Sequence, residues 1–88
     1  MIQQKITVQN KVGLHARPAA VLVSKAKEFD CEVTIENKGN SCTLKSVIGL
    51  MKLQCAMGDE LTITCCGKEE KACIESLTQL IHSKFGED

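Results

Sequence analysis

The side chains best suited to chemistry stand together in the segment 13–20, which reads Gly-Leu-His-Ala-Arg-Pro-Ala-Ala. His15 offers a nucleophilic ring nitrogen. Arg17, the only arginine, presents a fork of donors that suits phosphate oxygens. Pro18, the only proline, lacks a backbone N–H and is tolerated in the first turn of a helix. Pro18 therefore predicts the start of a helix, with His15 at or just before its N-terminus.

A helix N-terminus is a favourable place for an anion. Its first backbone N–H groups have no intrahelical acceptor and the macrodipole is positive there, so a phosphoryl group bonded to His15 is stabilised. The same positive end disfavours an imidazolium and favours a neutral, nucleophilic ring. No acid, base or metal ligand of the kind that hydrolysis needs accompanies His15 in this segment. These residues leave two interpretations open, a phosphoryl carrier or a histidine that merely caps a helix beside an ordinary surface cation, Arg17.

Composition narrows the class of protein. A chain of 88 residues favours a single domain, residues 1–88, without room for a deep substrate cavity. Eleven basic residues balance eleven acidic ones and aromatics are only 2%, so no attraction to nucleic acid is expected. The longest apolar run, 19–23, is far short of the roughly 20 residues of a membrane span, and no signal peptide is recognised. We therefore expect a cytoplasmic protein without membrane insertion.

Six cysteines are many for this length, and the even count raises the alternatives of a disulfide framework or a metal site. No Cys-x-x-Cys pair occurs, and neither histidine stands at a zinc-finger spacing. With no export signal, we predict reduced cysteines that act as small hydrophobic residues, and no metal site. A thiol redox or metal module remains an alternative. Cys65 and Cys66 are adjacent and should point to opposite faces of a strand. The six are Cys31, Cys42, Cys55, Cys65, Cys66 and Cys73.

The periodicity of apolar residues predicts the elements that must position these side chains. Their order is strand, helix, strand, strand, helix, strand, helix, and a turn at 37–40 joins two strands as a hairpin. Right-handed crossovers place the helices on one face of the sheet. We therefore predict an α+β fold, an open-faced β-sandwich with a four-stranded antiparallel sheet and three helices on one face. The expected strands are 2–8, 31–36, 41–44 and 60–66, and the expected helices are 16–29, 46 to about 53, and 68 to about 84.

A second patch lies in the short helix that Ser46 is expected to cap. This helix has too many apolar residues for one buried stripe, so some of Val47, Ile48 and Met51 should be exposed beside His15. Adaptable aliphatic and Met side chains suit repeated docking to several partners. The alternative is that they complete a small core. The stronger core candidates of this helix are Leu50 and Leu53.

The segment 13–20 resembles the active-site motif of HPr, the histidine-containing phosphocarrier family of the sugar phosphotransferase system, and the element order matches that family from end to end. The resemblance implies a carrier and not an enzyme, without a cofactor. His15 would accept a phosphoryl group from enzyme I, derived from phosphoenolpyruvate, and pass it to enzyme IIA domains, with Arg17 steadying the group. A monomer is expected. The implied docking face comprises Ala16, Arg17, Ala20, Val47, Ile48 and Met51.

The segment 45–51 resembles the regulatory site of HPr from low-GC Gram-positive bacteria, where an ATP-dependent HPr kinase/phosphorylase modifies the serine. This implies phosphorylation of Ser46, which adds nearly two negative charges to the docking face, weakens enzyme I binding and permits binding to a catabolite-control repressor. Gln54 stands where the family commonly has Gly, and Val47-Ile48 replaces Ile-Met. A purely regulatory module, and a paralogue devoted to nitrogen regulation or another branch, are the remaining hypotheses.

Overall fold

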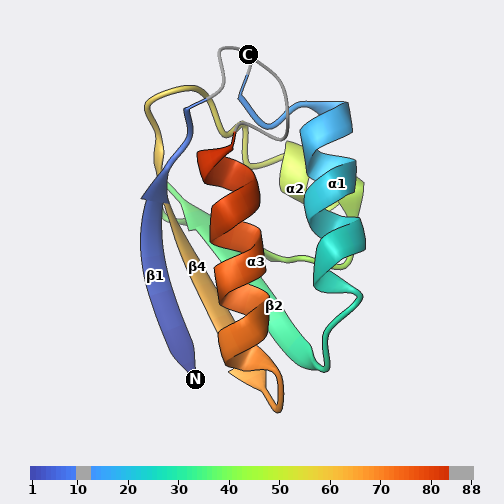
Figure 1. The fold of residues 1–88 in the computed structure, drawn as a ribbon. Helices are drawn as coiled ribbons and strands as arrows, with labels where there is room; N and C mark the ends of the chain where they lie inside the picture. The colour runs from blue at the N-terminus through green and yellow to red at the C-terminus, as the bar shows by residue number, and fades with distance from the viewer. Residues whose placement is uncertain (10–12, 84–88) are drawn as a thin grey trace.

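The structure, a computed structural model, describes residues 1–9 and 13–83. Four strands form one antiparallel sheet in the order β1-β4-β2-β3, and the helices cover one face of it (Figure 1). This arrangement confirms the predicted open-faced sandwich. None of the helices in the described ranges is long and apolar enough to cross a membrane. The elements are β1 (Ile2–Thr7), α1 (Ala16–Ala26), β2 (Cys31–Asn37), β3 (Asn40–Thr43), α2 (Val47–Met51), β4 (Glu60–Gly67) and α3 (Glu70–His82).

The core lies between the sheet and the helices. β4 is central, and its residues Leu61, Ile63 and Cys65 alternate inward with no exposed surface, whereas Cys66 faces outward as predicted. Each large apolar side chain buried in this way contributes about 1.5–3 kcal/mol. Leu50 and Leu53, the predicted core residues of the short helix, are also buried. The helices α1 and α3 supply Ala19, Leu22, Val23, Ala26, Cys73, Ile74, Leu77 and Ile81.

The first helix is shorter than its pattern predicts. α1 ends at Ala26 instead of Phe29. Beyond that point the N–H of Glu28 donates to the carbonyl of Lys25 at 3.1 Å, and the N–H of Phe29 donates to that of Ala26 at 3.3 Å. These i→i+3 bonds tighten the chain into a turn while Phe29 still packs against the core. The apolar period therefore continues past the end of the helix.

The last helix begins later than expected, at Glu70 instead of residue 68. The carboxylate of Glu70 reaches back to accept the N–H of Gly67 at 3.1 Å, so Lys68 and Glu69 form a turn. The expected end near residue 84 lies outside the described residues. α2 is also shorter and ends at Met51, and the strand bounds differ from the predicted ones by a single residue at some ends.

A buried asparagine ties the β2–β3 hairpin to the loop that follows α2. Asn37 is only 2% exposed, and its Nδ2 donates to the carbonyl of Leu53 at 3.2 Å and to Oδ2 of Asp59 at 3.3 Å. The same Asp59 oxygen accepts the N–H of Ala56 at 3.0 Å and lies 3.6 Å from the ammonium of Lys38. The residues between the short helix and β4 are therefore held by hydrogen bonds as well as by packing.

This network predicts a dependence of stability on pH. The N–H of Ala56, followed by Asn37 and Lys38, lowers the pKa of Asp59 from its ordinary value of 3.8, and burial opposes that effect. A carboxyl group with a depressed pKa contributes stability that is present above 3.8 and is lost as pH falls through the folded-state pKa. Asp59→Asn should therefore lower the free energy of unfolding at neutral pH, and the difference from the wild type should shrink in acid.

Urea unfolding of both proteins at neutral and acidic pH measures this difference. Glu60→Gln, at an exposed neighbouring carboxylate, is the matched control for the loss of one negative charge. A difference between Asp59→Asn and the wild type that stays constant with pH would contradict the assignment.

Candidate functional site

His15 lies immediately before the first helix, as predicted. It is the N-cap residue of α1, with extended backbone angles φ −85° and ψ −165° and an exposed side chain. Its carbonyl accepts the N–H of Ala19 at 2.9 Å and so begins the helical hydrogen bonding. The backbone N–H groups of Ala16 and Arg17 lie in the first turn, where a helix offers no acceptor, and Pro18 has no N–H to satisfy.

The electrostatics of this turn favour a negatively charged group. The first turn of α1 contains no acidic residue, so nothing in it neutralises the positive end of the helix macrodipole. The exposed guanidinium of Arg17 adds a full positive charge in the same turn. Pro18 is buried, which fixes the start of the helix against the core. The arrangement can hold an anionic group attached to the His15 ring.

The position of His15 depends on a close contact that the sequence did not reveal. The N–H of Leu14 donates to the carbonyl of Cys55 at 2.9 Å, across the loop that follows α2. Gly13 has φ +70°, and a Cβ there would lie 2.3 Å from the Cys55 oxygen and 2.9 Å from Cα of Ala56. The sequence does not predict this partner, because the contact joins distant segments without a local pattern.

Exposed apolar side chains on two adjacent helices form a surface beside this helix end. On α2, Ile48 is 68% exposed and Met51 is 41% exposed, as predicted, whereas Val47 is half-buried. α1 packs against α2 (Figure 1). Ala16 and Ala20 of α1 are exposed to solvent. The predicted docking residues thus lie on neighbouring elements, with Val47 the least accessible of them.

A shallow groove extends this surface along the exposed side of α1, with a volume of about 380 Å³. Its further residues were not predicted, although the helical spacing from Arg17 and Ala20 indicates them. Met57, which is 56% exposed in the loop before β4, was not predicted either. The groove is lined by Arg17, Ala20, Val21, Ser24, Lys25 and Glu28.

Ser46 and Gln54 lie on either side of α2, and Ser46 caps the helix as predicted. Ser46 is its exposed N-cap, and its hydroxyl oxygen accepts the N–H of Gly49 at 3.2 Å. Gln54 ends the turn that follows the helix, and its N–H donates to the carbonyl of Met51 at 3.1 Å. Its φ is +53°, in the left-handed region that favours Gly, so Gln54 costs about 1 kcal/mol there.

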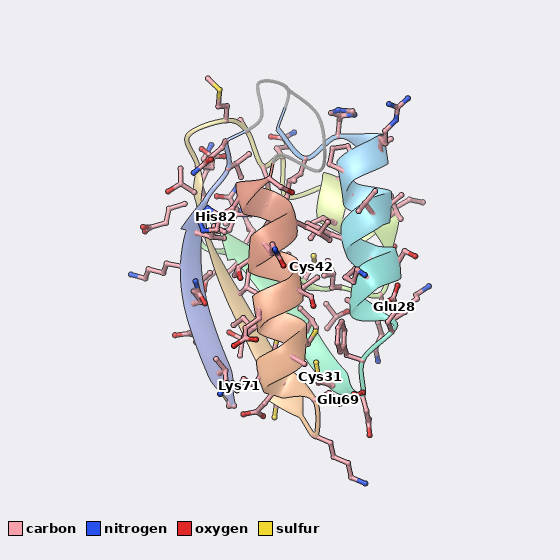
Figure 2. The ribbon with its side chains drawn as sticks, viewed as in Figure 1. Glu28, Cys31, Cys42, Glu69, Lys71 and His82 are labelled. Atoms are coloured by element: carbon pink, nitrogen blue, oxygen red, sulfur yellow. The ribbon has the colours of Figure 1, made fainter. Side chains whose placement is uncertain are left out.

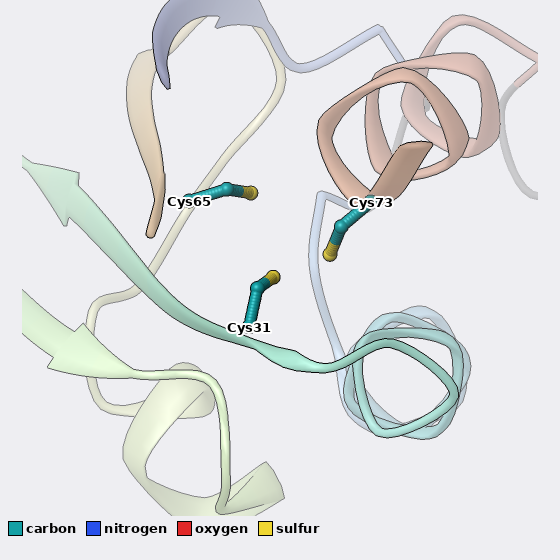
Figure 3. Close-up of side chains that lie close together, drawn as sticks. All are labelled: Cys31, Cys65 and Cys73. Carbon is teal, nitrogen blue, oxygen red and sulfur yellow. The ribbon is translucent and has the colours of Figure 1, made fainter. Parts of the chain in front are cut away.

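All six cysteines are free thiols, and three of them come together. The sulfur atoms of Cys31, Cys65 and Cys73 all lie within 4.8 Å of one another (Figure 3). Burial raises the pKa of the Cys65 thiol to about 11. The pKa of Cys73 is also raised, chiefly by burial and then by its contact with Cys31. These three thiols are the residues in the described ranges that could hold a metal ion.

Comparisons with known proteins agree with this geometry. The family described as the PTS HPr component phosphorylation site matches residues 2–83. The chain is 38% identical over 84 residues to the HPr-like protein Crh of Bacillus subtilis, covering 96% of this chain and 99% of that protein. It is 34% identical over 88 residues to the phosphocarrier protein HPr of Xylella fastidiosa, covering 100% of this chain and 99% of that protein.

Solved structures show the same fold. The crystal structure of HPr-C-His from Thermoanaerobacter tengcongensis superposes with a TM-score of 0.95 at 38% identity, covering 100% of this chain and 99% of that chain. A second structure from the same organism is described as an HPr dimer and superposes with a TM-score of 0.79 at 38% identity, covering 99% of this chain and 100% of that chain. The expectation of a monomer therefore does not hold across these relatives.

The close approach at Gly13 predicts a stability difference between two glycine substitutions. Gly58 also has a positive φ, +93°, but a Cβ there meets nothing within 4 Å. Gly58→Ala should cost about 1 kcal/mol for backbone strain alone, whereas Gly13→Ala should cost at least about 2–3 kcal/mol because strain and overlap add. Urea unfolding of the two variants measures the difference. Equal destabilisation would show that the loop accommodates the extra carbon without loss.

Proposed function

Because the chain belongs to the HPr family and acts as a phosphocarrier of the phosphotransferase system, not as a catalyst, we propose that His15 accepts the phosphoryl group. The donor is enzyme I, charged from phosphoenolpyruvate, and the acceptors are enzyme IIA domains of sugar uptake. The observation that carries this proposal is the exposed His15 side chain at the N-terminus of α1.

The chemistry of the transfer follows from that position. A ring nitrogen of His15 forms the bond to phosphorus as the bond to the donor breaks. The phosphoryl oxygens then lie at a helix end whose Ala16 and Arg17 N–H groups and positive dipole favour negative charge. The guanidinium of Arg17 steadies the group, and Pro18 fixes the turn that carries these donors. The same contacts leave the phosphoryl group open to an acceptor protein.

The partners are proposed to dock on one shared surface. Every donor and acceptor must reach the same histidine, so each has to cover the area around it. The exposed side chains of Ala16 and Ala20 on α1 and of Ile48 and Met51 on α2 support this assignment, and Val47 contributes its accessible part. Apolar side chains of this kind re-pack against partners of different shape.

Phosphorylation by phosphoenolpyruvate and enzyme I should give one acid-labile phosphate on the wild type and none on His15→Ala. Arg17→Ala should slow the transfer about tenfold to a hundredfold, because one charge-assisted hydrogen bond is lost. Lys71→Ala, which removes an exposed cation from α3 outside the docking surface, is the control and should transfer at the normal rate. Intact mass before and after acid treatment measures the phosphate, and label that persists on His15→Ala would refute the assignment.

Ser46 is proposed as a regulatory site for an ATP-dependent HPr kinase/phosphorylase. Its exposed hydroxyl caps α2, whose exposed Ile48 belongs to the docking surface. A phosphate there adds nearly two negative charges and several acceptor oxygens to this surface. We infer that the modified form binds enzyme I poorly and binds a catabolite-control repressor. The similarity to Crh of Bacillus subtilis, whose solution structure is described as that of the catabolite repression HPr, supports such regulation.

A kinase assay with ATP tests the regulatory site. It should give an acid-stable phosphate that is lost in Ser46→Ala and kept in Ser41→Ala, which removes another exposed serine. Phosphorylated wild type should then accept the phosphoryl group on His15 at least about tenfold more slowly, since added negative charge weakens docking. An acid-stable label that remains in Ser46→Ala places the modification elsewhere.

A purely regulatory module is the second candidate function, favoured by the similarity to Crh, which is described as a catabolite repression HPr. The combination of His15, Arg17 and Pro18 favours the carrier, and the phosphoenolpyruvate assay separates the two.

We place the protein in the cytoplasm, where a reducing environment suits six free cysteines.

A further inference from the structure

Three cysteines converge at the end of the molecule opposite to His15. Cys31 begins β2, Cys65 lies in β4 and Cys73 lies in the first turns of α3. Figure 3 shows the three side chains directed toward one another from these separate elements. Cys65 and Cys73 have no exposed surface, whereas Cys31 is half-buried. Figure 2 places Cys31 near Glu69 at the start of α3, and His82 at the other end of that helix.

The fold itself brings these thiols together. In the antiparallel register Val33 is opposite Cys65 and Cys31 is opposite Gly67, so Cys31 and Cys65 are diagonal neighbours on the inner face of the sheet. Gly67 leaves room for the Cys31 side chain, because a Cβ at Gly67 would lie 2.8 Å from that of Cys31. α3 packs on the same face and adds Cys73. The arrangement is therefore held by main-chain pairing and core packing.

We propose that Cys31, Cys65 and Cys73 form a three-thiolate site for a soft monovalent cation, copper(I). Thiolates select soft metal ions. In the described part of the chain, the cluster has three candidate ligand atoms and no fourth histidine, cysteine or carboxylate within the same distance. Structural zinc sites almost always take four ligands in a tetrahedron, whereas copper(I) is satisfied by three sulfurs in a plane.

The dimensions of the cluster fit such an ion. A metal–sulfur distance of about 2.3 Å, as in zinc thiolates, places three sulfurs of a trigonal site about 4 Å apart. The three sulfurs already lie within 4.8 Å of one another, so binding needs a contraction of less than about 1 Å at the most distant pair. Rotation of side chains around their χ1 bonds can supply a movement of that size.

The binding step is balanced without an oxidant or a reductant. Each thiol that coordinates the ion releases its proton to solvent, and copper enters and stays as copper(I). The half-buried Cys31 provides the entry path, since the other two thiols have no exposed surface. The bound ion would join β2, β4 and α3, and thus stabilise the folded protein without contact with the phosphoryl site.

The test is a titration of the fully reduced chain, without oxygen, with copper(I) held by a chelator of known affinity. The wild type should compete for one ion per chain. Cys31→Ser should bind at least about tenfold to a hundredfold more weakly, because loss of a ligand costs at least as much as loss of an outer-shell partner. Cys66→Ser is the matched control and should bind like the wild type, since Cys66 is exposed on the opposite face.

Three further measurements separate loss of copper binding from a folding defect. X-ray absorption of the wild-type complex should count three sulfur ligands, and copper(I) should raise the unfolding temperature of the wild type but not of Cys31→Ser. Circular dichroism checks that the variant is folded. The proposal is overturned by equal binding to Cys31→Ser, by loss of binding in Cys66→Ser, by two-sulfur coordination, or by formation of a disulfide among these cysteines in place of copper binding.

Discussion

The hydrogen bond from the N–H of Leu14 to the carbonyl of Cys55 is the contact on which the rest of the site depends. It joins the loop before α1 to the loop after α2, and the left-handed Gly13 lets the two backbones approach. Without this contact, α1 could pack on the sheet through its apolar stripe while His15 took many orientations relative to α2. With this hydrogen bond, His15 and the apolar surface of α2 keep a fixed relative position, so that one partner can contact both at once.

The buried polar network beneath that contact helps to hold the loop after α2 in place. Asn37 is satisfied by the carbonyl of Leu53 and the carboxylate of Asp59, and Asp59 in turn holds the N–H of Ala56. A buried amide is expensive to leave unpaired, so the network either forms completely or destabilises the fold. The hairpin turn at one edge of the sheet therefore helps to fix a loop that supports the phosphoryl site. In a domain this small, a few hydrogen bonds of this kind connect the sheet edge to the site.

The sequence predicted the parts of this structure that follow from local rules. Pro18 predicted the start of α1, and Ser46 was predicted correctly as the cap of α2. The adjacent Cys65 and Cys66 predicted the two faces of β4. Turns, caps and periodicity can be predicted because they depend on only a few neighbouring residues. The pairing of Leu14 with Cys55 has no such signature, since the two residues are far apart in the sequence and only the tertiary fold brings them together. The early end of α1 was missed for a related reason. Its apolar period continues into a turn that still packs on the core.

The cysteines show the same limit, and they also show how the two ends of the molecule differ. Spacing along the chain excluded familiar zinc motifs, yet three separate elements bring Cys31, Cys65 and Cys73 together. A copper(I) ion with three thiolates carries net negative charge, as does a phosphohistidine. Cys73 lies in the first turn of α3, where Glu70 offsets the positive end of the dipole, whereas the first turn of α1 after His15 holds no acidic residue. The difference is access. The His15 end is open, so that its group can be transferred, whereas the thiol end is buried, so that an ion bound there is retained.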